Sequence, residues 1–118
     1  MIIEPEVLVQ LAVEAAEGKK AFDITVLNIS EVSVVADYFI ICSSRSTVHA
    51  RAIADAIEEK LQEYGSSQPR REGFKTAQWL LLDYGSVVVH IFQEEQRHFY
   101  NLEHLWGDAQ VVKYTASM

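Results

Sequence analysis

The fold is decided by the stretch WLLLDYGSVVVHIF, residues 79 to 92. Two apolar runs flank a short turn, in which Gly85 is free to adopt a positive φ. This pattern predicts a β-hairpin with strands at 79–83 and 87–92. Because side chains alternate along a strand, the first run divides into two sets, namely Trp79, Leu81 and Asp83 on one face and Leu80, Leu82 and Tyr84 on the other.

Both faces of this hairpin are largely apolar, which leaves two interpretations open. The hairpin is either central, with helices covering both of its sides, or it has one face that docks a protein. In the second case the acidic residues Asp83, Glu94 and Glu95 would rim the docking surface. The composition of the hairpin favours neither interpretation.

Helical and extended patterns surround the hairpin. Apolar residues at helical spacing predict helices over residues 5–18, 47–64 and 93–106. Runs of β-branched and apolar residues predict strands over 23–29 and 38–42. The stripe that the middle helix is expected to pack inward consists of Val48, Ile53, Ile57, Leu61 and Tyr64.

The order helix, strand, strand, helix, hairpin, helix implies one mixed β-sheet packed with helices. The fold class is α/β or α+β, and the pattern does not separate the two. A chain of 118 residues suits a single domain, residues 1–118. We expect residues 66–72 to form a polar loop and residues 108–118 a short C-terminal tail.

The charge balance restricts the class of partner. The chain has 10 Lys and Arg residues and 17 Asp and Glu residues, which gives a formal net charge of -7. A protein that neutralises phosphates is normally basic, so this balance argues against a specific nucleic-acid partner and against an anionic membrane surface.

Cys42 is the single cysteine of the chain, so an internal disulfide is excluded. The first residues lack the basic and apolar regions of a secretory signal, and no apolar run approaches the length of a membrane span. These features predict a cytoplasmic protein. As part of an apolar strand, the Cys42 thiol is expected to be inert.

The sequence predicts no catalytic residue, no metal site and no cofactor. The four histidines form no HExxH pair, and no GxxxxGK[ST], GxGxxG or Asp-x-Asp motif occurs. A pair of acids on one strand would be needed to hold the metal ions of a nucleotidyl transferase. His90 lies within an apolar strand, so it faces either the core or a partner.

Several stretches closely resemble the ribosomal silencing factor family, also called RsfS or Iojap-like. They are ADYFIICS (36–43), IAD (53–55), EG (72–73), AQWLLLDYGSVVVHIF (77–92) and EEQRHFYNLEHLW (94–106). The resemblance spans about residues 5 to 107, and the hairpin followed by the last helix is its most specific part. Ser86 departs from the acid expected there in many members.

The resemblance implies a nucleotidyltransferase-like fold without catalysis, which agrees with the missing Asp-x-Asp. It further implies a translation repressor that binds the free large ribosomal subunit through its ribosomal protein number fourteen. Such a protein blocks joining of the small subunit and slows protein synthesis under nutrient limitation.

The resemblance and the strand alternation together favour Trp79 as the aromatic anchor of the ribosomal-protein-binding site over a place in the core. The other candidate site residues are Leu81, Asp83 and His90 near it, with Arg97 and Tyr100 from the last helix. The alternative for Tyr100 and Trp106 is packing of that helix on the sheet.

Two other functions stay open. The chain could be a nucleotidyltransferase-like nucleotide-binding enzyme, which nucleotide binding with Mg²⁺ would reveal. It could also be a homodimeric adaptor whose hairpin pairs with itself, which light scattering would reveal.

Overall fold

The computed structural model describes residues 3–100 and 110–112, which form a six-stranded mixed sheet with helices packed on it. The elements are α1 (Pro5–Gly18), β1 (Phe22–Asn28), β2 (Tyr38–Ser44), α2 (Thr47–Glu63), β3 (Arg70–Glu72), β4 (Trp79–Asp83), β5 (Val87–Gln93), α3 (Glu94–Tyr100) and β6 (Gln110–Val112). The strand order across the sheet is β3-β4-β5-β2-β1-β6.

The central pair of the sheet, β5 and β2, is parallel, and all other neighbouring strands are antiparallel. The predicted mixed sheet packed with helices is therefore confirmed. Its largely antiparallel pairing places the fold in the α+β class, which resolves the choice that the sequence left open.

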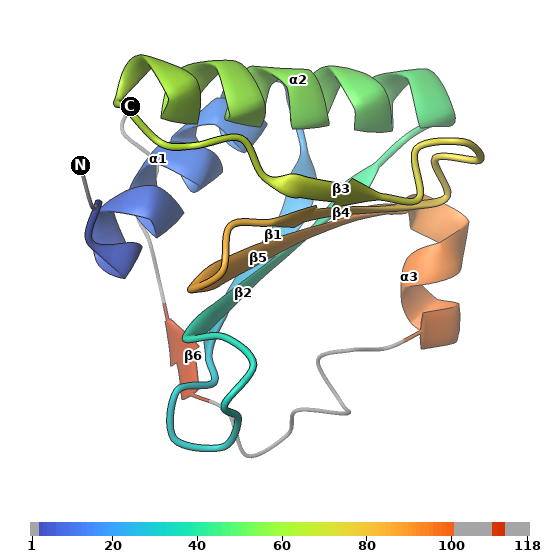
Figure 1. Cartoon of the computed structure of the whole chain (residues 1–118). Helices are drawn as coiled ribbons and strands as arrows, with labels where there is room; N and C mark the ends of the chain where they lie inside the picture. The colour runs from blue at the N-terminus through green and yellow to red at the C-terminus, as the bar shows by residue number, and fades with distance from the viewer. Residues whose placement is uncertain (1–2, 101–109, 113–118) are drawn as a thin grey trace.

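Helices α1 and α2 cover one face of the sheet (Figure 1). Pro5 occupies the first turn of α1, where its missing N–H costs nothing. Ser46 caps α2, because its Oγ accepts a hydrogen bond from the His49 backbone N–H at 3.1 Å. Under the two helices, Leu80 and Leu82 of β4 join the larger apolar core.

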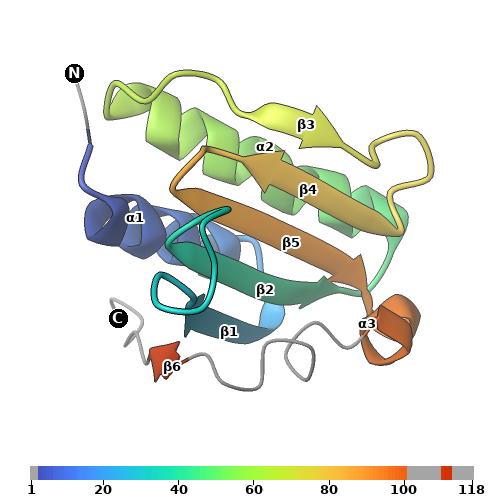
Figure 2. The same cartoon turned by 60° about the horizontal axis from the view of Figure 1, so that its bottom comes forward.

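The opposite face of the sheet carries a second apolar cluster. It contains Leu27, Ile29, Ala36, Phe39, Ile41, Val88 and Phe92, with Trp79 and Leu81 packed against it. In Figure 2 this face is turned forward, with the loop between β1 and β2 near one end of β5 and α3 near the other. Of the described helices, only α3 lies on this side.

The prediction for the inward stripe of α2 is wrong at both of its ends. Val48 is 73% exposed and Tyr64 is 53% exposed. The buried side chains of α2 are Ala50, Ile53, Ala54, Ile57 and Leu61. Since Val48 and Tyr64 lie at the ends of the helix, they extend past the apolar surface that buries its middle.

Two strands lie where the sequence predicts none. β3 falls in the expected polar loop, and β6 falls in the expected C-terminal tail. The β2 strand also continues to Ser44, whose Oγ donates to the Phe92 carbonyl oxygen at 3.3 Å.

The last helix is predicted over residues 93–106, and the structure shows α3 over Glu94–Tyr100. Residues 101–106 lie outside the described part of the chain.

None of the described helices is both long enough and apolar enough to span a lipid bilayer.

Candidate functional site

The sheet register gathers most of the predicted site residues on the face opposite α1 and α2. Directly paired residues of neighbouring strands point to the same side, so this face consists of cross-strand rows. The rows are Trp79–Phe92–Ser43, Leu81–His90–Ile41–Thr25 and Asp83–Val88–Phe39–Leu27. We call the set Trp79, Leu81, Phe39, His90 and Phe92 the aromatic face.

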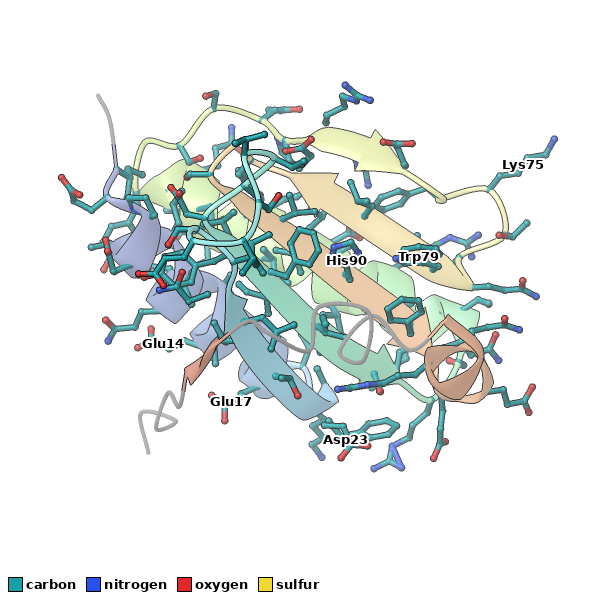
Figure 3. All side chains as sticks on the ribbon, turned by 90° about the horizontal axis from the view of Figure 1, so that it is seen from below. Glu14, Glu17, Asp23, Lys75, Trp79 and His90 are labelled. Atoms are coloured by element: carbon teal, nitrogen blue, oxygen red, sulfur yellow. The ribbon has the colours of Figure 1, made fainter. Side chains whose placement is uncertain are left out.

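Trp79 and His90 are joined across β4 and β5. The indole Nε1–H of Trp79 donates to Nδ1 of His90 at 3.1 Å. Because Nδ1 accepts this hydrogen bond, the neutral imidazole carries its proton on Nε2. Figure 3 shows the two labelled residues side by side on this face of the sheet.

The imidazole of His90 stays neutral over the physiological pH range. It is 4% exposed, and burial lowers its pKa from 6.5 to about 4, although the nearby Asp83 carboxylate opposes the shift. Among the residues that the structure describes, its Nε2 has no hydrogen-bond partner. The sequence predicts that His90 faces the core or a partner, and the structure places it in the buried part of the aromatic face.

The rings of the aromatic face hold one another in place. Trp79 stacks on Phe92 with ring centroids 4.9 Å apart, and Phe39 meets His90 edge-on at 4.6 Å. Phe92 and His90 are buried, whereas Trp79 and Leu81 are half-buried at the side toward β3. This geometry gives Trp79 a fixed orientation while part of it stays accessible.

Asp83 closes the hairpin turn at the far end of β4. Its Oδ1 accepts a hydrogen bond from the Gly85 backbone N–H at 2.8 Å, and Gly85 has the expected positive φ of 88°. The register of β4 places Asp83 on the same face as Trp79 and Leu81, as predicted. Its carboxylate also stabilises the hairpin turn.

Arg97 reaches the sheet from α3 at the other end of the Trp79 row. Its guanidinium donates to Ser43 Oγ at 2.9 Å, to Thr25 Oγ1 at 3.2 Å and to the Asp23 carbonyl oxygen. These contacts fix α3 to β1 and β2. Tyr100 is the last residue of α3, and its side chain lies outside the described part of the structure, as do Trp106 and the side chain of His98.

A pocket borders the aromatic face where β3 meets β4. It has a volume of about 240 Å³ and is lined by Glu72, Gly73, Trp79 and Leu81. Glu72 and Gly73 belong to the stretches that resemble the family, but they are not among the site residues predicted from the sequence. Their adjacency to Trp79 depends on the pairing of β3 with β4, which the sequence does not reveal.

The described residues offer little for catalysis. Cys42 is fully buried, and burial raises the pKa of its thiol to about 12, so no thiolate forms near neutral pH. Within the described ranges, no three His, Cys, Asp or Glu side chains are grouped to hold a metal ion. The arrangement is suited to binding, with ordered rings at its centre and carboxylates at its edge.

Comparison with known proteins assigns the chain to a family. The family model described as ribosomal silencing factor during starvation matches residues 3–117. A ribosomal silencing factor of Halalkalibacterium halodurans is 45% identical over 106 residues, covering 90% of this chain and 91% of the relative. One from Bacillus subtilis is 44% identical over 105 residues, covering 89% of each chain.

A solved structure agrees with these sequence relatives. The crystal structure of a Chromobacterium violaceum protein has a TM-score of 0.86 and 32% identity, covering 98% of this chain and 94% of that one. The resemblance seen in the hairpin and the last helix is therefore confirmed. On the match over nearly its whole length, the chain belongs to the ribosomal silencing factor family.

Proposed function

We propose that this chain binds the free large ribosomal subunit through its ribosomal protein number fourteen, and so blocks joining of the small subunit. In this role it slows protein synthesis under nutrient limitation, acts in the cytoplasm as a single domain, and catalyses no reaction. The observation that carries the proposal is the aromatic face, with its half-buried Trp79, in a member of the ribosomal silencing factor family.

Trp79 is the proposed anchor of the interface. Binding energy at protein interfaces concentrates in a few Trp, Tyr and Arg residues. The stacking on Phe92 and the hydrogen bond to His90 already hold the Trp79 ring in one orientation. Little side-chain entropy therefore remains to be lost when a partner covers it.

The other candidate residues have distinct proposed roles. Leu81 extends the apolar contact beside Trp79, and Asp83 supplies negative charge at the end of β4. His90 acts by orienting Trp79, and Arg97 acts by holding α3 on the sheet, from which Tyr100 would contribute to the interface. The acidic net charge of -7 favours a basic ribosomal protein over bare RNA as the contact.

The mechanism of repression is steric. A small folded protein that occupies one contact patch of the large subunit removes that patch from the small subunit. By mass action, one occupied interface then suppresses a much larger assembly. This mechanism requires no bound cofactor and no chemical step.

The test is co-sedimentation with ribosomal particles after Trp79→Ala. The unmodified chain should migrate with free large subunits and be depleted from joined ribosomes. Trp79→Ala should weaken binding by about thirtyfold, the loss typical of truncating an aromatic anchor. Binding of purified large subunits in a titration measures this factor.

Tyr64→Ala is the matched control, because Tyr64 is an exposed aromatic residue at the end of α2. It should leave binding unchanged. Trp79→Phe, which keeps an aromatic ring over Phe92, controls for loss of folding, and thermal unfolding is followed for all variants. Equal recovery of the unmodified chain from free large subunits and joined ribosomes would contradict the proposal, as would metal-dependent nucleotidyl transfer by it.

A further inference from the structure

The pocket between β3 and β4 combines two kinds of wall. Trp79 and Leu81 present an indole and an aliphatic side chain, and Glu72 adds a carboxylate. Its volume of about 240 Å³ is below the roughly 300–1,000 Å³ of sites that bind drug-sized molecules. The pocket therefore suits one side chain of a partner and not a cofactor.

The backbone at Gly73 sets the shape of this pocket. Gly73 has a φ of 82°, and a Cβ at this position would lie 2.0 Å from the Trp79 carbonyl oxygen. Only glycine allows so close an approach of the two backbones. The chain leaving β3 thereby stays against the start of β4, and Glu72 is kept beside Trp79 and Leu81.

Glu72 is available to a partner. Its nearest cation within the described residues is Arg70, at 3.6 Å between Nη2 and Oε2, with the two side chains 77% and 56% exposed for Arg70 and Glu72. Ion pairs this exposed contribute little and exchange readily with solvent. A cation that also covers Trp79 and Leu81 would displace Arg70 at small cost.

A lysine or arginine side chain matches all three walls. Both have an apolar stem and a charged head, so the stem can lie on Leu81 while the head reaches the carboxylate. The face of an indole attracts a cation as well. An acidic or purely apolar side chain would leave the Glu72 carboxylate either repelled or desolvated without a partner.

We propose that this pocket receives one lysine or arginine side chain of the partner, with Glu72 as the residue that selects it. The inference rests on the proposed function, because the partner is taken to be the basic ribosomal protein of the large subunit. It adds a binding pocket and a recognition residue at the edge of the aromatic face.

The experiment measures binding of Glu72→Gln and Glu72→Lys to purified large subunits at two salt concentrations. At low salt Glu72→Gln should bind about three- to tenfold more weakly than the unmodified chain. Glu72→Lys should bind still more weakly, because it places a like charge against the incoming cation. The deficit of Glu72→Gln should shrink at high salt, where the lost charge is screened.

Glu59→Gln is the matched control, since it removes the same charge from an exposed position of α2. It should bind like the unmodified chain. If Glu72→Gln and Glu72→Lys bind as well as the control, the pocket proposal is wrong while the proposed function stands. If the unmodified chain does not bind large subunits at all, the proposed function is wrong and this inference falls with it.

Discussion

His90 shows how a single buried residue orders the site. Its Nδ1 accepts the Trp79 indole N–H at 3.1 Å, and its ring contacts Phe39 on the other side. An imidazolium could not accept this bond, because both of its nitrogens carry protons. The orientation of Trp79 therefore depends on His90 remaining neutral.

The first prediction concerns the pH dependence of stability. In the folded chain the pKa of His90 is lowered to about 4, against 6.5 for an exposed histidine. Between these values the unfolded chain binds a proton that the folded chain does not, so acidification from pH 7 to pH 5 favours unfolding. We expect His90 to account for about 2 kcal/mol of the stability lost over this range.

Urea unfolding of the unmodified chain and of His90→Gln at pH 7 and pH 5 measures this contribution. Glutamine does not titrate, yet its amide oxygen can accept the Trp79 N–H. The variant should therefore lose about 2 kcal/mol less than the unmodified chain between the two pH values. An equal loss for both proteins would show that the imidazole of His90 titrates normally in the folded state.

Individual residues of the site differ in how far the sequence could place them. Strand alternation alone puts Trp79, Leu81 and Asp83 on one face, and the structure confirms it. Arg97 and Asp23 are 74 positions apart in the sequence, and no sequence pattern predicts that they are in contact. Arg97 could be named from the resemblance, but its attachment to the sheet could not.

At the scale of elements, Arg97 ties α3 to the sheet. Arg97 donates to Ser43, Thr25 and the Asp23 backbone, and Ser43 is buried with 1% exposure. Replacing Arg97 with Met removes these three hydrogen bonds and takes the guanidinium donor from the buried Ser43 hydroxyl. We expect a loss of about 1–3 kcal/mol in the free energy of unfolding.

Hydrogen exchange distinguishes a local effect from a global one. In Arg97→Met the amides of α3 should exchange faster, while those of α2 keep their protection relative to global unfolding. Arg70→Met, which changes an exposed arginine of β3, should alter stability by less than about 0.5 kcal/mol. Unchanged exchange in α3 would mean that other contacts hold this helix.

The elements that the sequence predicted share a strong local signal. The hairpin has two apolar runs and a glycine turn, and α1 and α2 have apolar residues at helical spacing. β3 and β6 are three residues long, and they exist because β4 and β1 offer them an edge to pair with. A strand of three residues is too short to show an alternating pattern of apolar and polar residues. For this reason the sequence does not predict that Glu72 lies beside Trp79.

At the scale of the whole molecule, the net charge of -7 should govern the rate of association. Glu94 and Glu95 are exposed in the first turn of α3, beside the end of β5. Neutralising both, in Glu94→Gln/Glu95→Gln, should slow association with large subunits by about two- to fivefold at low salt. Dissociation should barely change, since exposed rim charges act mainly on the encounter.

Stopped-flow binding at two ionic strengths tests this prediction. The control is Glu59→Gln/Glu63→Gln, which removes the same two charges from exposed positions of α2. If both double variants slow association equally, the effect belongs to total charge and not to the α3 edge. A deficit that persists at high salt would contradict an electrostatic origin.

The parallel pairing of β2 with β5 also has a consequence for how the chain folds. Tyr38 pairs with Val87 and Ser44 with Gln93, so the middle of the sheet joins segments separated by all of α2, β3 and β4. Contacts this distant along the chain form slowly, because the entropy of closing a long loop is lost before the contacts stabilise the chain. A nascent chain that ends before β5 would leave one edge of β2 unpaired, and that apolar edge invites aggregation. The centre of the sheet and the aromatic face can therefore form only after the chain has been synthesised through Gln93.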